Sequence, residues 1–325
     1  MKAAWYERNG PARDVFKVGE MEAFEPAEGE VRVRLHASGV NPSDVKSRAG
    51  RPLIAPRIIP HSDGAGVIEA TGSGVSHSRI GERVWIWNGQ WKRPFGTAAE
   101  FITLPESQAI RLPDKLNFGE GACLGIPALT AMHAVRLHGD VGGKTLLITG
   151  GGSAVGHYAT QIAKARGARI MATASGKRAE HARQAGADFV INYKAKDVAR
   201  TIRDLTNGKG VDGIIDMDLS STASLLPEGV LTSHGKMACY GSNFAGDINI
   251  SFPAMLWNSL TLQVFVVYEL TWAERDAAIK DLTPMLEAGS LKHSIGARFP
   301  LADIAAAHEA VEEGRTVGNI VLDIA

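Results

Sequence analysis

Seven residues that follow an apolar segment have the composition of a phosphate-binding turn. The apolar segment covers 145–149, and a stretch with helical character covers 155–166. The turn between them consists of Gly150, Gly151, Gly152, Ser153, Ala154, Val155 and Gly156. Small residues here let the chain turn tightly, let the backbone approach a pyrophosphate and let the helix pack close to the strand. The amides and the dipole of the helix N-terminus would then hold the phosphates.

This turn predicts that the chain binds a dinucleotide. Ser153 stands where the strict G-x-G-x-x-G pattern has its middle glycine, but the order strand, turn, helix, strand supports the interpretation. The alternative is a glycine turn with a purely structural role.

The residues after the second apolar segment indicate which dinucleotide is bound. Segment 169–174 is followed by Ser175, Lys177 and Arg178, and no acidic residue stands there. A site for NAD usually places Asp or Glu at this point, on the ribose 2′-hydroxyl. Hydroxyl groups and cations bind a 2′-phosphate, which a carboxylate would repel. These residues therefore favour NADPH; the alternative is that both cations belong to a solvated first helical turn.

Alternating strands and helices must position this turn. Apolar segments predict strands at 145–149, 169–174, 188–192, 211–217, 235–241 and 260–267. Helices are expected at 155–166, 177–185, 197–206, 222–232 and 253–258. Near-continuous apolar strands that alternate with helices are typical of a parallel sheet covered on both faces. We therefore expect an α/β fold with a Rossmann-type, doubly wound, six-stranded parallel sheet.

The first 120 residues predict a second, β-rich domain. Short strands are expected at 30–40, 64–75, 81–88 and 97–105, separated by Gly and Pro. Trp85 and Trp87 alternate along one of these strands, with Trp91 nearby, and could either form an aromatic wall for a planar ligand or pack in the core.

Charge and cysteine content exclude several classes of protein. The formal net charge is zero, whereas nucleic-acid or anionic-membrane binders usually have a basic excess. Two cysteines, Cys123 and Cys239, are too few for a disulfide framework. The first ten residues lack the apolar core of a signal peptide, and no run of about 18 apolar residues exists. We expect a cytoplasmic protein with no nucleic-acid or membrane partner.

The chain resembles the medium-chain dehydrogenase/reductase superfamily, and most closely its zinc-free NADPH:quinone oxidoreductase (zeta-crystallin-like) branch. The resemblance covers essentially the whole chain and is carried by segments such as SGVNPSDVKSRAG (38–50), IPHSDGAGVIEATGSGV (59–75) and GGGSAVGHYATQIAKARGA (150–168). It implies a GroES-like catalytic domain at 1–121 and 268–325 and an NADPH-binding Rossmann domain at 122–267. It also implies an enzyme that transfers hydride from NADPH to a quinone, and a homodimer in which 260–267 pairs across a two-fold axis.

The resemblance also permits a test for zinc. Zinc alcohol dehydrogenases of this superfamily carry a ligand cysteine at or near Asn41, and a G-H-E segment where this chain has His61, Ser62 and Asp63. A catalytic zinc needs three ligands of Cys, His or carboxylate type, and only Asp63 remains at these positions. We predict no metal. Without a Lewis acid, reduction of an electron-poor acceptor is favoured over alcohol oxidation.

The resemblance assigns cofactor contacts to residues spread along the chain. Asn41 and Pro42 are expected at the nicotinamide end, Thr130 near the nicotinamide or its ribose, and the backbone amides of Ser153, Ala154 and Val155 on the pyrophosphate. Tyr193 joins Ser175 and Arg178 around the 2′-phosphate. The expected cleft-lining and backbone contacts are Tyr240, Gly241, Ser242, Asn243, Phe265, Val266, Val267 and Asn319, the last where the branch often has Lys or Arg.

Three residues are candidates for catalysis: Asn41, Asp44 and Lys46. Lys46 stands where the branch often has tyrosine, and it either orients an acceptor oxygen or is a surface lysine. Asp44 is either a catalytic group or a helix cap. No general acid is assigned, because solvent could protonate a hydroquinone.

Three other functions are open at this point. One is an NADPH-dependent reductase of α,β-unsaturated carbonyls, which uses the same hydride step. Another is a nucleotide- or RNA-binding, crystallin-like protein without catalysis. The third is a zinc dehydrogenase.

Overall fold

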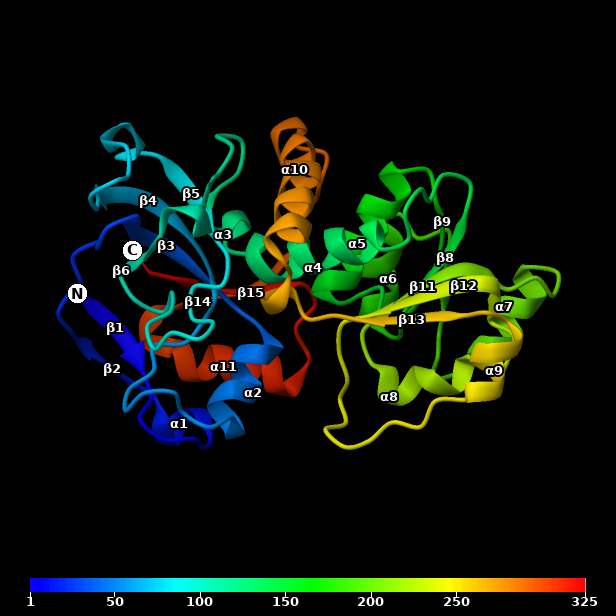
Figure 1. Ribbon diagram of the computed structural model, residues 1–325. Helices are drawn as coiled ribbons and strands as arrows, with labels where there is room; N and C mark the ends of the chain where they lie inside the picture. The colour runs from blue at the N-terminus through cyan, green and yellow to red at the C-terminus, as the bar shows by residue number, and fades with distance from the viewer. Residues whose placement is uncertain (325) are drawn as a thin grey trace. The chain divides into compact units, whose positions relative to one another are not determined.

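The computed structural model describes residues 1–324, which form two compact units (Figure 1). One unit contains Met1–Ile126 and the chain from Leu286 onward, and the other contains Pro127–Met285. Within residues 1–324, no helix is both long and apolar enough to cross a bilayer.

The second unit begins at Pro127 and ends at Met285, whereas the sequence predicts boundaries after residues 121 and 267. Most of α10 (Trp272–Ala288) belongs to the second unit. Its Asp281 forms ion pairs with Arg136 and Arg166, and its Arg275 donates a hydrogen bond to the carbonyl oxygen of Val267 at 2.7 Å. The two ion pairs of Asp281 join residues 145 and 115 positions apart, which local sequence does not show, and they place the helix with the second unit.

The second unit is built on a six-stranded parallel sheet. Its strands are β8 (Thr145–Ile148), β9 (Arg169–Thr173), β10 (Phe189–Ile191), β11 (Val211–Asp216), β12 (Leu231–Cys239) and β13 (Thr261–Val264). They lie in the order β10-β9-β8-β11-β12-β13, and every neighbouring pair is parallel. This confirms the doubly wound sheet, whose strand order reverses between β8 and β11.

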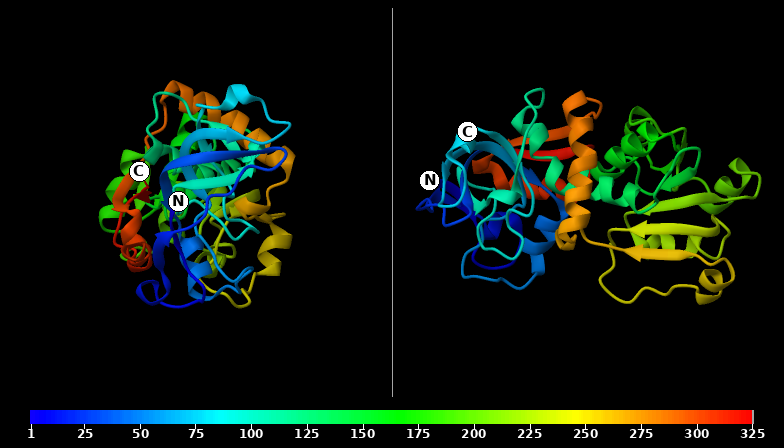
Figure 2. Two further views of the ribbon diagram at one scale, coloured as in Figure 1. Left: turned by 90° about the vertical axis from the view of Figure 1, so that its left-hand side faces the viewer. Right: turned by 45° about the horizontal axis from the view of Figure 1, so that its top comes forward.

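Helices lie on both sides of this sheet, as Figure 1 and the right-hand view of Figure 2 show. They are α4 (Leu129–Arg136), α5 (Ala154–Ala165), α6 (Lys177–Gln184), α7 (Val198–Leu205), α8 (Leu219–Thr222) and α9 (Phe252–Trp257). The expected helix at 222–232 is wrong. A 3-10 turn at Ala223–Leu225 follows α8, and β12 begins at Leu231. Pro227 and Gly229, which has a φ of +66°, do not favour a helix there, and burial of Val230 and Leu231 favours the strand.

The first unit contains a sheet of seven strands. The strands are β3 (Glu30–Val40), β4 (Asp63–Thr71), β5 (Arg83–Ile86), β6 (Phe101–Pro105), β7 (Ala109–Arg111), β14 (Ile295–Pro300) and β15 (Asn319–Asp323). Four of them, β3 to β6, overlap the strands expected from the sequence. The order is β14-β15-β3-β4-β5-β7, and β6 pairs with β3. Val31, Val33 and Leu35 alternate into the core, as expected for a strand with one buried face.

Shorter elements surround this sheet. They are β1 (Lys2–Trp5), β2 (Lys17–Glu20), α1 (Ala12–Val15), α2 (Pro42–Gly50), α3 (Phe118–Gly121) and α11 (Ile304–Glu313). A single turn of π-helix at Leu124–Ala128 contains Pro127, which has no amide hydrogen to donate to a regular α-helix.

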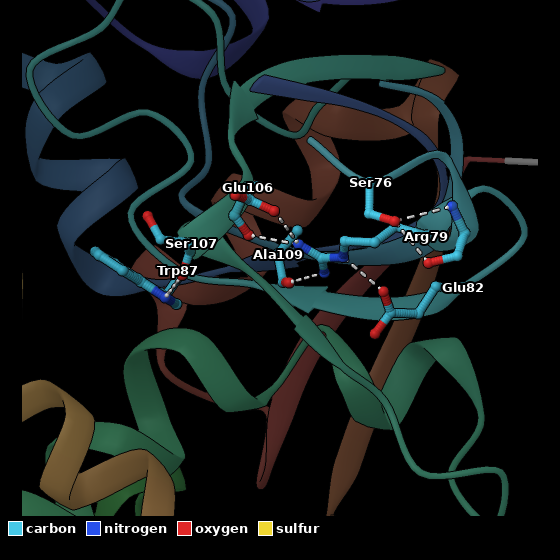
Figure 3. A network of polar contacts seen from close by, with 8 residues as sticks. Ser76, Arg79, Glu82, Trp87, Glu106, Ser107 and Ala109 are labelled. Carbon is cyan, nitrogen blue, oxygen red and sulfur yellow. Dashed lines mark hydrogen bonds and ion pairs between the residues drawn. The ribbon is translucent and has the colours of Figure 1, made fainter. Parts of the chain in front are cut away.

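A polar network joins the turn at His77–Arg79 to Glu106 and to the first residue of β7 (Figure 3). The guanidinium of Arg79 donates to the Glu82 carboxylate at 2.7 Å and to the Ala109 carbonyl oxygen at 2.7 Å. The indole N–H of Trp87 donates to the Ser107 carbonyl oxygen at 3.2 Å. Trp85 and Trp87 are both buried, so they pack in the core and do not form an exposed wall.

Candidate nucleotide-binding and catalytic residues

A cavity of about 550 Å³ lies at the carboxyl ends of the strands of the second unit. Its lining includes residues that directly follow β8, β9 and β11, among them Thr149, Gly150, Ala174, Met217 and Asp218. In open α/β sheets, ligands bind outside the carboxyl ends of the strands, near the point where the strand order reverses. The cavity therefore lies where the fold itself favours a dinucleotide.

Close packing requires the glycines of the phosphate turn. A Cβ atom at Gly152 would overlap the carbonyl oxygen of Arg178, and one at Gly156 would overlap the carbonyl oxygen of Gly150. The amide of Gly151 donates to the carbonyl oxygen of Thr173 at 3.0 Å, which ties the turn to the end of β9. The turn thus has the tight geometry that the sequence predicts.

The N-terminus of α5 supplies amide donors, but not all of those expected. Ser153 is the N-cap, and its hydroxyl accepts from the Gly156 amide at 3.1 Å. The backbone amide of Ser153 donates to the Gly150 carbonyl oxygen at 2.8 Å and is thus used within the turn. The amides of Ala154 and Val155 belong to the first helical turn and have no acceptor within the helix. These two amides are the better candidates for a pyrophosphate.

Three of the four residues predicted to surround a 2′-phosphate line the cavity. They are Ser175, Arg178 and Tyr193. Lys177 is exposed and does not line it. A hydroxyl, a guanidinium and a phenol are suitable partners for a phosphate dianion.

One acidic residue, Asp218, also lines the cavity. Its two carboxylate oxygens accept hydrogen bonds from the backbone amide and the side-chain amide of Asn243, each at 2.9 Å. Burial acts to raise the pKa of Asp218, but hydrogen bonds from Ser220, Ser221 and Asn243 together lower it. Asp218 follows β11 and not β9, so the end of β9 carries no acid, as the sequence predicts.

Tyr240 directly follows β12 and provides a test of whether the site fits a nucleotide. Its hydroxyl is buried beside Ser153, and no residue among those described accepts its proton. Burial raises the pKa of Tyr240, so the phenol keeps its proton. A buried donor without an acceptor costs free energy, and a phosphate or ribose oxygen would satisfy it. Together with the closely packed glycines, this donor fits NADPH.

The residues after Tyr240 are engaged with the surrounding backbone. A Cβ atom at Gly241 would lie 2.7 Å from the Met217 carbonyl oxygen, so the two segments are in close contact. The hydroxyl of Ser242 accepts from the Phe244 amide at 3.0 Å. Asn243 lines the cavity, whereas Gly241 and Ser242 do not.

The residues expected near the nicotinamide lie in other parts of the second unit. Thr130 is buried in α4. The Phe265 ring packs edge-on against His133, with centroids 4.8 Å apart. Val266 is exposed, and Val267 is buried with its carbonyl oxygen bonded to Arg275. Their contacts with a cofactor stay predictions.

Sequence reasoning missed a polar pair at the reversal point of the sheet. The hydroxyl of Thr149 donates to the Asp216 carboxyl at 2.7 Å and accepts from the Met217 amide at 3.0 Å. Burial raises the pKa of Asp216. Thr149 and Asp216 stand at or next to the ends of the apolar segments 145–149 and 211–217, which become neighbouring strands of the sheet. This pattern could have indicated the pair.

In the first unit, Asn41 joins two buried acids. Its backbone amide donates to Asp44 at 2.8 Å, and its side-chain amide donates to Asp63 at 2.9 Å. Burial raises the pKa of Asp44 to about 7 and raises that of Asp63 well above its usual range, with the Asp44 charge adding to the second effect. Asp44 accepts from the N-cap amide of α2, which is the capping alternative left open by the sequence.

The other predicted residues of the first unit have varied surroundings. Pro42 and Lys46 are exposed on α2. Asn319 is buried in β15, and its side-chain amide donates to the Ser294 carbonyl oxygen at 2.9 Å. Catalytic or cofactor roles for these three residues stay predictions.

The positions that correspond to zinc ligands do not fit a catalytic zinc. Nδ1 of His61 hydrogen-bonds the Ser38 hydroxyl at 2.9 Å, and Nε2 lies 2.9 Å from Nε2 of His308. Burial lowers the pKa of His61 to about 3, so the ring is neutral. Within residues 1–324, no three His, Cys, Asp or Glu side chains gather as a metal site.

Both units match known protein families. Residues 27–114 match the alcohol dehydrogenase GroES-like domain, and residues 154–283 match the zinc-binding dehydrogenase family. The chain is 32% identical to a quinone oxidoreductase of Pseudomonas aeruginosa, over 95% of both chains. It is 30% identical to a 2-haloacrylate reductase of a Burkholderia species, over 99% of this chain and 98% of that protein. The structure of an Escherichia coli quinone oxidoreductase complexed with NADPH is similar over 100% of both chains, with a TM-score of 0.87 and 26% identity.

Proposed function

Because the chain belongs to the quinone oxidoreductase branch of the medium-chain dehydrogenase/reductase superfamily, we propose that it transfers hydride from NADPH to a quinone. The observation that carries the proposal is the cavity lined by Ser175, Arg178 and Tyr193 beside the phosphate turn. A hydroxyl, a cation and a phenol favour the 2′-phosphate, and the end of β9 carries no acid to bind a 2′-hydroxyl.

The protein's part in this reaction is to bind and orient. NADPH supplies the hydride when bound. The amides of Ala154 and Val155 would hold its pyrophosphate, and Arg178 would hold the 2′-phosphate. Quinones spread the charge that they gain over their π system, so positioning and exclusion of water provide most of the catalysis, and solvent provides the proton. We propose that Asn41, Asp44 and Lys46 act at the acceptor end.

A second candidate is the reduction of α,β-unsaturated acids or carbonyls. It is favoured by the similarity to a 2-haloacrylate reductase over nearly the whole chain. A carbon–carbon double bond conjugated to a carboxylate accepts hydride by the same step as a quinone. The two candidates share the cofactor site and differ only in the acceptor.

The test is NADPH oxidation, followed by absorbance, against quinones, alkenals and 2-haloacrylates, with NADH in parallel. Turnover of quinones with NADPH and little with NADH is the expected result. Turnover of haloacrylates or alkenals alone would move the function to the second candidate. Binding of NADPH with no turnover of any acceptor would favour a protein without catalysis.

We further propose a homodimer through the outer edge of the parallel sheet. β13 is the last strand of that sheet, and its Val264 is 64% exposed. The neighbouring α9 carries Trp257, which is 83% exposed. An unpaired, apolar strand edge favours pairing with a second copy across a two-fold axis. Light scattering should give twice the mass of the chain for the wild type and a shift toward monomer for Val264→Lys. The cytoplasmic location stays a prediction.

A further inference from the structure

Two buried imidazole rings stack between α5 and α6. The ring centroids of His157 and His181 are 4.0 Å apart, and their planes differ by 8°. Both side chains are buried. Nδ1 of His181 lies 3.1 Å from the carbonyl oxygen of Gly152, in the phosphate turn. A polar contact thus joins α6 to the backbone of the turn.

The direction of this hydrogen bond fixes the tautomer of His181. A carbonyl oxygen can only accept, so Nδ1 carries the proton and donates it. Burial lowers the pKa of His181, and the charge of Arg178 lowers it further, although the bond to Gly152 acts in the opposite direction. The ring is therefore a neutral donor at physiological pH.

The same face of α6 makes the other contacts with the turn. A Cβ atom at Gly152 would overlap the Arg178 backbone, and one at Gly151 would lie 3.6 Å from Cβ of Ala182. Residues 178, 181 and 182 share one helix face because they are three and four positions apart. Arg178 lines the cavity. One helix face therefore meets the phosphate turn and also carries the cation predicted for the 2′-phosphate.

The peptide that His181 holds is central to the turn. The Gly152 carbonyl and the Ser153 amide belong to one peptide group, and that amide donates to Gly150 at 2.8 Å. His181 therefore holds one side of this peptide group, and Gly150 holds the other. Loss of the His181 donor would leave this peptide group held only by the bond from the Ser153 amide to Gly150.

We propose, resting on the proposed use of NADPH, that His181 is a positioning residue that fixes the Gly152 peptide relative to Arg178. With this distance fixed, one cofactor molecule can engage the phosphate turn and the Arg178 guanidinium together. NADPH uses both contacts, whereas NADH uses only the turn. Loss of the hydrogen bond therefore weakens NADPH binding more than NADH binding.

The experiment measures dissociation constants by fluorescence titration of NADPH and NADH, without any acceptor. His181→Leu removes the donor, and a buried hydrogen bond of this kind corresponds to a loss of about five- to tenfold for NADPH. NADH binding should weaken less than about twofold, because NADH uses only the phosphate turn and not Arg178. His181→Asn, whose amide nitrogen occupies the place of Nδ1, should restore NADPH binding. His181→Gln, whose amide matches Nε2, should not. His138→Leu, at a half-buried histidine of the same unit, controls for general loss of stability.

Equal weakening of both cofactors in His181→Leu, or unchanged binding, would overturn the proposal. If the leucine variant does not fold, the Asn and Gln variants provide the same comparison, and equal NADPH binding by these two would overturn it. A wild type that binds NADPH but reduces no acceptor would reject the proposed reaction alone, because the dissociation constants still test His181. A wild type that does not bind NADPH would reject both.

Discussion

The side-chain amide of Asn41 donates a hydrogen bond to the carboxyl group of Asp63, with 2.9 Å between nitrogen and oxygen. Both side chains are buried. Asn41 therefore supplies the side-chain hydrogen bond of this acid, and a backbone hydrogen bond from Ile126 acts on its pKa in the same direction.

Asn41→Ala should lower the free energy of unfolding by about 1–3 kcal/mol, because it leaves a buried acid without its donor. Urea denaturation at fixed pH measures the change. Asn258→Ala, which removes a half-buried amide bonded to the Ala254 carbonyl oxygen at 3.0 Å, is the control and should cost less. Equal losses in the two variants would contradict the importance of the Asp63 contact.

Asp44→Asn should flatten the dependence of stability on pH. Burial raises the pKa of Asp44 from 3.8 to about 7, so its stabilising contribution is complete below about pH 4 and is lost as the pH rises through 7. The variant keeps an acceptor for the Asn41 amide but carries no charge. Relative to the wild type, it should gain roughly 1.4 kcal/mol for each pH unit crossed in this window.

Urea unfolding between pH 4 and pH 8 tests this prediction. The exposed Asp14→Asn is the matched control and should follow the wild-type curve. An Asp44→Asn curve parallel to that of the wild type at every pH would show that burial does not hold the proton on this carboxyl.

Arg178→Ala should raise KM for NADPH about tenfold to a hundredfold, the range for hydrogen bonds to charged groups. KM for NADH should change little, because NADH has no 2′-phosphate. Lys177→Ala is a close control, since this neighbouring cation is exposed and does not line the cavity. If the two variants behave alike, the 2′-phosphate is not bound by Arg178.

Gly152→Ala should abolish tight binding of either nucleotide. A methyl group here overlaps the Arg178 backbone, so the turn must move away from α6. Gly50→Ala, where a Cβ atom meets nothing within 4 Å, should behave as the wild type. Nucleotide titration with both proteins distinguishes the outcomes, and normal binding by Gly152→Ala would show that the turn tolerates displacement.

Local patterns in the sequence determined the order of strands, glycine turn and helices in the nucleotide-binding unit. Runs of apolar residues such as 145–149 and 211–217 have the period and length of buried parallel strands, and the glycine turn lies directly between a strand and a helix. The absence of an acid after 169–174 is equally local, so the sequence alone suffices to predict Ser175 and Arg178 as cofactor contacts. These features depend on neighbours within a few positions of the chain.

Only the tertiary structure decided which distant residues meet. Asn41 and Asp63 are 22 positions apart, and Thr149 and Asp216 are 67 apart, yet each pair is joined by a hydrogen bond. Burial at these contacts sets the pKa of the acids, and burial depends on the packing of whole elements. The strand that begins at Leu231 replaced an expected helix for the same reason, since the sheet buries Val230 and Leu231. His181 meets Gly152 because α6 packs on the turn, a contact that no spacing in the sequence predicts.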